Sequence, residues 1–282
     1  MATGSKNDGG SSPTHRLGCL ALVVALCGML DSPALAEDLV PGRDQFSGFI
    51  EAAPHVVVQR ARGSVGTNFD FSARKSNILT NLTFRLGGGV KGPAIESWWG
   101  RPRPVVYAGA LIPINESSTI GAELTNSSGG GFDRVKGKKF AIEYQTSGVA
   151  GLGMEFTVPI LDFELGITPA IESLHLVSRY TGEGSLLIQS QSPGIPSESH
   201  DVRTKKEITQ HFLGPAIRLS TPTTAVRGVF IDLFLSTSLL FDVAGTHERI
   251  PVDGENGDQA EFNFETGSGA VQVSTGFQLR WP

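Results

Sequence analysis

Charged side chains recur at alternate positions of otherwise apolar segments, and these are the residues whose types could support chemistry. Two carboxylates held close together could act as general acid and base. Glu143 and Glu155, however, are twelve residues apart in one alternating segment, a separation of about 40 Å along a strand. They cannot form an acid–base pair, so the alternating charges indicate a shared polar face. The predicted polar face holds Arg85, Glu143, Glu155, Glu164, Glu172, Arg218, Asp232, Asp242 and Arg280.

Histidine and serine side chains could support acyl transfer if an acid oriented the histidine. His175 follows Ser173 near the end of an alternating segment, but no motif connects either residue to an acid. The remaining histidines beyond position 36 are equally isolated: His55, His200, His211 and His247. The sequence therefore predicts no catalytic, cofactor-binding or metal-binding residue, and we expect the protein not to be an enzyme.

The segments that carry the charges have the two-residue period of strands. In 271–281, Val, Val, Thr, Phe, Leu and Trp alternate with Gln, Ser, Gly, Gln and Arg. Residues 78–90, 140–158, 163–172 and 229–243 alternate in the same way, and 49–63, 103–114 and 207–219 do so less cleanly. These segments predict eight strands, with ten as the alternative count. Phe262 and Phe264 have the opposite parity to the last strand, and a bulge at 267–269 is predicted to reset it.

Strand length and connector length decide between two all-β classes. The longest alternating runs cover about 15–20 residues, whereas strands of soluble sandwiches usually have about 5–6. Short connectors (159–162, 220–226) and the longer 91–103 are predicted at one end, and polar connectors (67–76, 116–136, 181–204, 249–260) at the other. We therefore predict a closed antiparallel up-and-down transmembrane β-barrel with short periplasmic turns and long external loops. A soluble β-sandwich is the alternative.

The N-terminal segment predicts export. A polar stretch with Lys6 and Arg16 precedes a short apolar run, and Ala34 and Ala36 complete a small-residue cleavage pattern. The predicted organisation is a signal peptide at 1–36, a periplasmic segment at 37–45 and a barrel at 46–282. Both cysteines, Cys19 and Cys27, fall inside the predicted signal, so no disulfide is expected. The net charge of −5 is too small to suggest a nucleic-acid partner.

The last strand carries a specific pattern. Read toward Trp281, its final eight residues are polar, any, Gly, two of any, apolar, any and aromatic, and Ser274, Gly276, Leu279 and Trp281 fit. This pattern resembles the C-terminal assembly signal of bacterial outer-membrane barrels, although Pro282 extends the chain by one residue. Together with the strand pattern, it makes the chain similar to the small eight-stranded OmpA/OmpX/OmpW-like barrels.

The resemblance implies partners and positions. Expected partners are the barrel assembly machinery, outer-membrane lipid and lipopolysaccharide, with an unknown external ligand. Trp98, Trp99 and Trp281 would form an interface girdle at the periplasmic end. Basic side chains at the opposite end either contact lipopolysaccharide phosphates or form a solvated rim. The proposed contacts are Lys136, Lys138, Lys139, Arg203, Lys205 and Lys206.

Three functions follow, in different classes. The leading hypothesis is a structural or interaction role, in which the barrel anchors in the outer membrane and presents loops outside. An eight-stranded barrel is narrow enough for side chains to fill, so its polar face is expected to form a buried plug. The alternative is that the same face lines a narrow channel for small solutes. The third is a lipid-modifying enzyme, since barrels of this architecture include lipid A acyltransferases and deacylases that use histidine and serine.

Overall fold

The computed structural model describes residues 45–67, 73–96, 98, 101–115, 117–127, 133–160, 163–188, 198–226, 229–245, 247–253 and 259–281. No helix in these ranges is long and apolar enough to cross a membrane. The strands within them are β1 (Ser47–Thr67), β2 (Ala73–Lys91), β3 (Arg103–Pro113), β4 (Ser117–Ser127), β5 (Asp133–Tyr144), β6 (Ser147–Ile160), β7 (Phe163–Ile188), β8 (Glu198–Val226), β9 (Val229–Asp242), β10 (His247–Asp253) and β11 (Gln259–Trp281). The predicted signal peptide and residues 37–44 lie outside the described residues.

Eight of these strands close into an antiparallel ring in the order β1, β2, β3, β6, β7, β8, β9 and β11. The ring closes where the start of β1 meets the end of β11, with Gly48 opposite Trp281 and Leu279 opposite Ile50. This pairing explains the strong alternation of the last residues, because the final strand has a partner on each side, β1 and β9. The predicted all-β, closed, eight-stranded antiparallel fold is confirmed.

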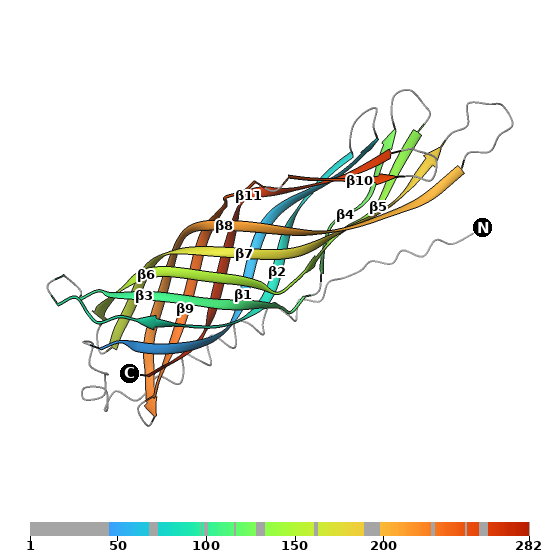
Figure 1. Ribbon diagram of the computed structural model, residues 1–282. Helices are drawn as coiled ribbons and strands as arrows, with labels where there is room; N and C mark the ends of the chain where they lie inside the picture. Colours follow the sequence, from blue (N-terminus) through green and yellow to red (C-terminus); the bar gives the residue numbers. More distant parts are fainter. Residues whose placement is uncertain are drawn as a thin grey trace, which may run out of the picture. The chain divides into compact units, whose positions relative to one another are not determined.

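Beyond the ring, the strands continue into what we call the extension. Strands β4, β5 and β10 lie there, together with the distal parts of β1, β2, β7, β8 and β11, at the end of the barrel away from the C-terminus (Figure 1). In the extension the ladders form two sheets, β4-β5-β7-β8 and β2-β1-β11-β10. Among the described residues no ladder joins β4 to β2 or β10 to β8.

Polarity in the ring is inverted relative to a soluble protein. Large apolar side chains cover its outer wall, with Ile171 62% and Leu152 60% exposed, and Phe277, Leu235 and Phe84 also exposed. Its interior holds buried charged and amide side chains, together with buried apolar and aromatic ones. An apolar outer band around a polar interior is the pattern of a barrel wall in contact with lipid.

Polarity in the extension is that of a soluble sandwich. One cluster of buried apolar side chains fills it, drawn from both sheets: Ala61, Leu79, Ile120, Phe140, Ile142, Tyr144, Tyr180, Ile208, Phe262 and Phe264. Phe140 of one sheet packs on Phe262 of the other with ring centroids 5.8 Å apart, and Tyr180 packs on Phe264 at 5.1 Å. Burial raises the pKa of the Tyr180 hydroxyl above its usual value.

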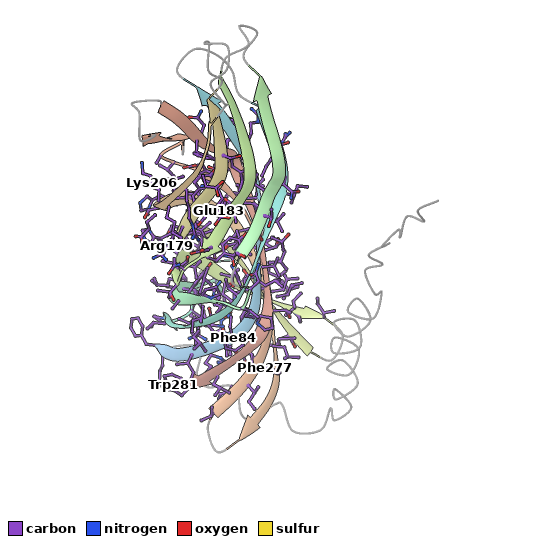
Figure 2. All side chains as sticks on the ribbon, turned by 90° about the vertical axis from the view of Figure 1, so that its right-hand side faces the viewer. Phe84, Arg179, Glu183, Lys206, Phe277 and Trp281 are labelled. Atoms are coloured by element: carbon purple, nitrogen blue, oxygen red, sulfur yellow. The ribbon has the colours of Figure 1, made fainter. Side chains whose placement is uncertain are left out.

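The two polarities are visible on the outer wall. Figure 2 shows Phe84, Phe277 and Trp281 in one half of the barrel and Arg179, Glu183 and Lys206 in the other. Ion pairs on the outside of the extension join Arg203 to Glu183 at 3.2 Å and Arg62 to Glu265 at 3.4 Å. The outer wall thus changes from apolar to charged along the same strands.

A bulge explains how the interior changes from apolar in the extension to polar in the ring while the apolar residues keep even numbers in the sequence. The segment predicted as one strand over 140–158 is broken at Gln145 and Thr146 into β5 and β6. Against β7, Tyr144 pairs with Ser178 but Gly148 pairs with His175, so the broken strand holds one extra residue. Such a residue turns all following side chains to the other face. Apolar even-numbered side chains therefore point inward in β5 and outward in β6.

The predicted bulge in the last strand has a different effect. Gln59 pairs with Ala270 and Ala61 with Thr266, so β11 has two extra residues at 267–269. Two extra residues preserve parity, and Phe262 and Phe264 accordingly lie inside with the polar residues of the ring rather than outside with Val271. The expected reset of parity was wrong, because the extension buries its apolar side chains.

The predicted connectors were too long. Residues of 116–136, 181–204 and 249–260 belong largely to β4, β5, β7, β8, β10 and β11, and the first and last residues of 67–76 belong to β1 and β2. Gly and Ser in these segments led us to predict loops, but the β7–β8 ladder continues to Ile188 and Glu198. The extension is therefore built of paired strands over most of its described length.

Candidate functional site

The inward positions of the ring bring its charges into one buried network. Glu51 of β1 lies between two arginines, and its side chain is fully buried. Arg85 Nε of β2 donates to one carboxylate oxygen and Arg218 Nη1 of β8 to the other, each at 2.6 Å. Arg85 lies on β2, which pairs with β1, whereas β8 is separated from β1 by β11 and β9 in the ring. The bond from Arg218 to Glu51 therefore crosses the bore. A carboxylate with two arginine partners inside a barrel is a cross-brace.

Glu172 of β7 forms the second node of the network. It accepts from the Tyr107 hydroxyl and from Ser238 Oγ, both at 2.8 Å, and from the Gln272 side-chain amide. Arg85 Nη1 lies 3.6 Å from Glu172, so Arg85 links the two carboxylates. The node joins β2, β3, β7, β9 and β11, and it closes the bore from several sides at once.

The network continues toward the C-terminal end of the ring. Arg218 donates to Gln278 at 2.8 Å and lies over the Phe234 ring at 3.9 Å. Gln278 donates to Asp232 at 3.1 Å, and Arg280 donates to the same carboxylate at 3.0 Å. Arginine can satisfy a carboxylate and an aromatic face together, since its guanidinium is planar.

A further pair lies at the same end. Lys91 Nζ is 2.5 Å from Glu155, and both side chains are almost fully buried. Arg103 donates to the Gly92 carbonyl at 2.8 Å and to Ser47 Oγ at 3.0 Å. Carboxylates and cations are therefore close to balanced inside the described ring, as burial of charge requires.

Small residues make room for the large side chains of the bore. Gly151 of β6 faces Tyr107, and a Cβ at this glycine would lie 2.2 Å from the tyrosine ring. Any larger residue would displace the hydroxyl that holds Glu172. An apolar layer lies between the charge network and the extension. It consists of Val57, Leu111, Val149, Leu174, Leu176, Phe212, Leu240 and Ala270. The bore is thus filled in turn by charged, apolar and aromatic side chains.

The predicted polar face is divided by the structure. Arg85, Glu155, Glu172, Arg218, Asp232 and Arg280 lie buried in the network. Glu164 and Asp242 are half-buried at opposite ends of the inward face, and Asp242 accepts from the backbone N–H groups of Ala244 and Gly245 at the end of β9.

Glu143 was predicted in the lumen and lies outside. Its carboxylate is 3.7 Å from Arg179 and 3.9 Å from Lys205 on the outer wall of the extension. The bulge after Tyr144 is the reason, because Glu143 before it faces outward, whereas the odd-numbered positions of β6 after it, such as Glu155, face inward.

Sequence reasoning missed half of the network. Glu51, Lys91, Arg103, Tyr107, Gln272 and Gln278 were not proposed as site residues, and Lys91 and Arg103 were placed in a turn. Glu51 could have been found, because Glu51, His55 and Gln59 alternate with Ile50, Val56 and Val58 along the first strand. Ala53 and Val57 also face inward, so the alternation of this segment is irregular, and it is the weakest of the predicted strands.

The other predicted positions are placed as follows. Ser274 and Gly276 face the interior, whereas Leu279 and Trp281 are exposed on the outer wall. Trp98 is exposed in the β2–β3 connector at the same end as Trp281, and Trp99 lies outside the described residues. Their roles in assembly and at the interface stay predictions.

The predicted lipopolysaccharide contacts, expected near external strand ends or loops, lie in strands. Lys136, Lys138 and Lys139 belong to β5, and Arg203, Lys205 and Lys206 belong to β8. Lys205 pairs in register with Thr181 and Lys206 with Tyr180. Arg203 and Lys205 are exposed next to Glu183 and Glu143, so acidic side chains offset part of their charge.

The residues considered for acyl transfer do not assemble with an acid in the part of the chain that is described. His175 contacts His211 across β7 and β8, and Ser173 Oγ donates to the Ala150 carbonyl at 3.3 Å. Both histidines are exposed on the outer wall, while His55 is buried in the ring. No group of three or more potential metal ligands occurs among the described residues.

Comparison with known proteins finds solved structures of low similarity to this chain. No protein-family model and no curated protein matches the chain. Among solved structures, the outer membrane protease OmpT from Escherichia coli is 8% identical, with 87% of this chain and 99% of that chain covered and a TM-score of 0.37. The outer membrane protein OprG from Pseudomonas aeruginosa is 8% identical, with 85% and 98% covered and a TM-score of 0.32. Neisserial surface protein A is 8% identical, with 79% and 97% covered and a TM-score of 0.24.

Proposed function

We propose that this protein is a non-conducting outer-membrane barrel with a structural or interaction role, anchored by its ring and presenting its extension outside the cell. The observation that carries the proposal is the filled bore. Glu51, Arg85 and Arg218 bridge the ring at 2.6 Å contacts, with side chains no more than 5% exposed. Between them and the far end of the barrel, the apolar layer and the extension cluster add further buried side chains to the interior.

The membrane location is supported by the polarity of the outer wall. A soluble protein rarely exposes a continuous apolar surface of this kind. Apolar side chains project outward from neighbouring strands of the ring, among them Leu86, Val106, Leu152, Ile171, Ile217, Leu235 and Phe277. Lipid would cover this surface, and the charged wall of the extension would lie in water or among lipid headgroups.

The rival function is a narrow channel for small solutes. The interior polar groups could carry ions only if water replaced their contacts with one another. Each of the two carboxylates Glu51 and Glu172 has several donors within hydrogen-bond distance, and removing a buried charge from its partners is costly. We expect this cost to keep the bore closed.

Conductance in a planar lipid bilayer tests the proposal. The purified protein should give no stepwise currents, whereas a variant with Arg85→Ala, Arg218→Ala and Glu51→Ala should give small, regular steps because the braces are gone. The matched control is Arg203→Ala, which removes an exposed arginine of the extension and should stay silent. Regular currents from the unmodified protein would establish a channel instead.

A lipid-modifying activity is tested separately. Mass spectra of lipid A from cells with and without the protein should be identical under the proposed structural role. A missing or added acyl chain that depends on Ser173 would replace that role with an enzyme. Contact with lipopolysaccharide is compatible with the proposal, and Lys205→Glu should weaken co-purification of lipopolysaccharide if the charged wall binds its phosphates.

A further inference from the structure

Two histidines form an exposed pair on the outer wall. His175 of β7 lies directly opposite His211 of β8 in the antiparallel ladder. Their side chains point away from the bore, and both residues are exposed. The two Nδ1 atoms are 3.2 Å apart, the ring centroids are 4.7 Å apart and the ring planes are tilted by 47°. Two ring nitrogens thus converge on one point at the surface.

The spacing of the nitrogens suits a metal ion as well as a hydrogen bond. A tetrahedral Zn²⁺ ion holds its imidazole nitrogens at about 2.0–2.1 Å, which places two such nitrogens roughly 3.3 Å apart. Imidazole is a good ligand for Zn²⁺, Cu²⁺ and Ni²⁺. The observed 3.2 Å therefore matches the separation that two ligands of one tetrahedral ion require.

The strands hold the pair before any ion binds. The β7–β8 ladder runs without a register shift from Gly166 opposite Ser220 to Ile188 opposite Glu198, so the backbones on both sides of the pair are fixed. A site on paired strands needs little rearrangement to bind, which favours affinity. Both side chains lie on the outer face of the wall, because side chains of a strand alternate between the two faces of the sheet.

There is space around the pair for further ligands. Gly148 of β6 lies beside His175 in register, and a Cβ at this glycine would meet nothing nearer than the Gly109 carbonyl at 4.0 Å. The pair sits between apolar Ile171 and Leu213 on one side and charged Arg179 and Lys205 on the other. Water can therefore reach the nitrogens from the side of the extension.

From this geometry we infer that His175 and His211 form a two-histidine site for a divalent transition-metal ion on the outer wall of the barrel. The two Nδ1 atoms supply two ligands, and water fills the open positions. Because no third histidine, cysteine or carboxylate joins the pair among the described residues, the ion stays accessible from outside. The site is independent of the proposed structural role.

Cu²⁺ is a suitable probe, because nitrogen ligands split its electron paramagnetic resonance signal. The detergent-solubilised protein without an affinity tag should bind one Cu²⁺ with the coupling pattern of two imidazole nitrogens. Zn²⁺ should compete for the site only in large excess, because imidazole sites bind Cu²⁺ more tightly. His175→Ala and His211→Ala should each weaken this binding roughly tenfold or more, equivalent to about 1.4 kcal/mol. Both positions are exposed, so the variants should keep the heat-modifiable migration of the folded barrel in detergent gels.

A rescue variant separates the rung geometry from histidine content. Ser173 and Leu213 are the outward pair two residues away in the same ladder, so they share the spacing of the histidine pair. Ser173→His with Leu213→His, in a chain that also carries His175→Ala and His211→Ala, should restore two-nitrogen binding. The single variant Ser173→His in that background should not. Unchanged Cu²⁺ binding after His175→Ala with His211→Ala would overturn the inference, because the ion would then be held elsewhere.

Discussion

The ring and the extension are built from the same strands but bury opposite kinds of side chain. In β1, Glu51 and His55 face the interior of the ring and Ile50 faces outward, whereas Ala61 faces the interior of the extension and Arg62 faces outward. The backbone geometry is similar in both regions, since β1, β7 and β8 pass through them as continuous strands and β11 does so with the bulge at 267–269. What differs is the medium that we propose around each region, lipid around the ring and water around the extension.

The two regions also close differently. The eight strands of the ring pair edge to edge in a closed circle, so each described strand of the ring has a neighbour on both sides. This closure is obligatory in lipid, which offers the backbone no hydrogen-bond partner. The extension is two sheets held face to face by an apolar cluster, and water can satisfy its strand edges. All strand edges must therefore be paired only in the region whose outer wall is apolar.

The largest expected difference between the regions concerns their ion pairs. Arg85→Ala leaves Glu51 with one arginine and removes the link between Glu51 and Glu172. Breaking a buried ion pair costs about 3–5 kcal/mol, so the free energy of unfolding should fall by that amount. Urea unfolding in lipid vesicles, followed by tryptophan fluorescence, measures the change.

The control for this variant is Arg203→Ala in the extension. Arg203 is paired with Glu183 at 3.2 Å, but its side chain is 63% exposed, and such pairs contribute about 0–1 kcal/mol. Equal losses for the two variants would contradict the distinction between a buried network in the ring and a solvated surface on the extension.

A smaller effect is expected when charge is added to the two outer walls. Leu235 projects from the middle of β9 and is 46% exposed, so Leu235→Arg would place a cation in lipid at a cost of about 2–4 kcal/mol. Ser268→Arg adds the same side chain at an exposed position of the β11 bulge and should change stability by less than about 0.5 kcal/mol. If Leu235→Arg were as mild as Ser268→Arg, the ring would not be embedded in lipid.

The strand pattern of the ring could be predicted because its polarity is uniform. Residues 271–281, 78–90 and 229–243 alternate throughout, and each lies in a strand of the ring for most of its length. Arg85, Glu172, Arg218, Asp232 and Arg280 could be assigned to one polar face for the same reason. Which carboxylate meets which arginine depends on register across the bore, and alternation within a single strand carries no information about that.

The extension could not be predicted because two changes cancel in the sequence. From β5 to β6 the polarity of the interior reverses, and the bulge at Gln145 and Thr146 reverses the side chains as well. Apolar residues therefore keep even numbers from Phe140 to Phe156, and the segment resembles one long strand in lipid. In β11 only the polarity reverses, so Phe262 and Phe264 break the pattern visibly. That break was the available signal for a second region.

The closed ring and the open extension meet where β2 passes from β3 to β4, and we call this boundary between β2 and β4 the seam. Here the ladder of β2 with β3 ends, and the Asn115 side chain continues it: its Oδ1 accepts from Leu82 N–H at 2.6 Å and its Nδ2 donates to the Thr80 carbonyl at 3.1 Å. A carboxamide has the donor and acceptor of a peptide group, so it replaces one rung of the sheet. Asn77 makes a similar bond to the Thr119 carbonyl at 3.1 Å.

We expect Asn115→Ala to loosen this seam without opening the ring. Loss of two hydrogen bonds should cost about 1–2 kcal/mol, and it should appear as faster hydrogen exchange at Leu82 because its N–H loses its acceptor. Asn115→Asp keeps the acceptor for Leu82 and removes the donor to Thr80, so exchange at Leu82 should stay slow. Ser173→Ala provides the comparison in the ring, where Ser173 and Ala150 are already paired by the β6–β7 ladder and the lost hydroxyl should have little effect. If Ser173→Ala and Asn115→Ala accelerated exchange equally, side-chain bonds would matter no more at the seam than within a complete ladder, and the extension would be as tightly closed as the ring.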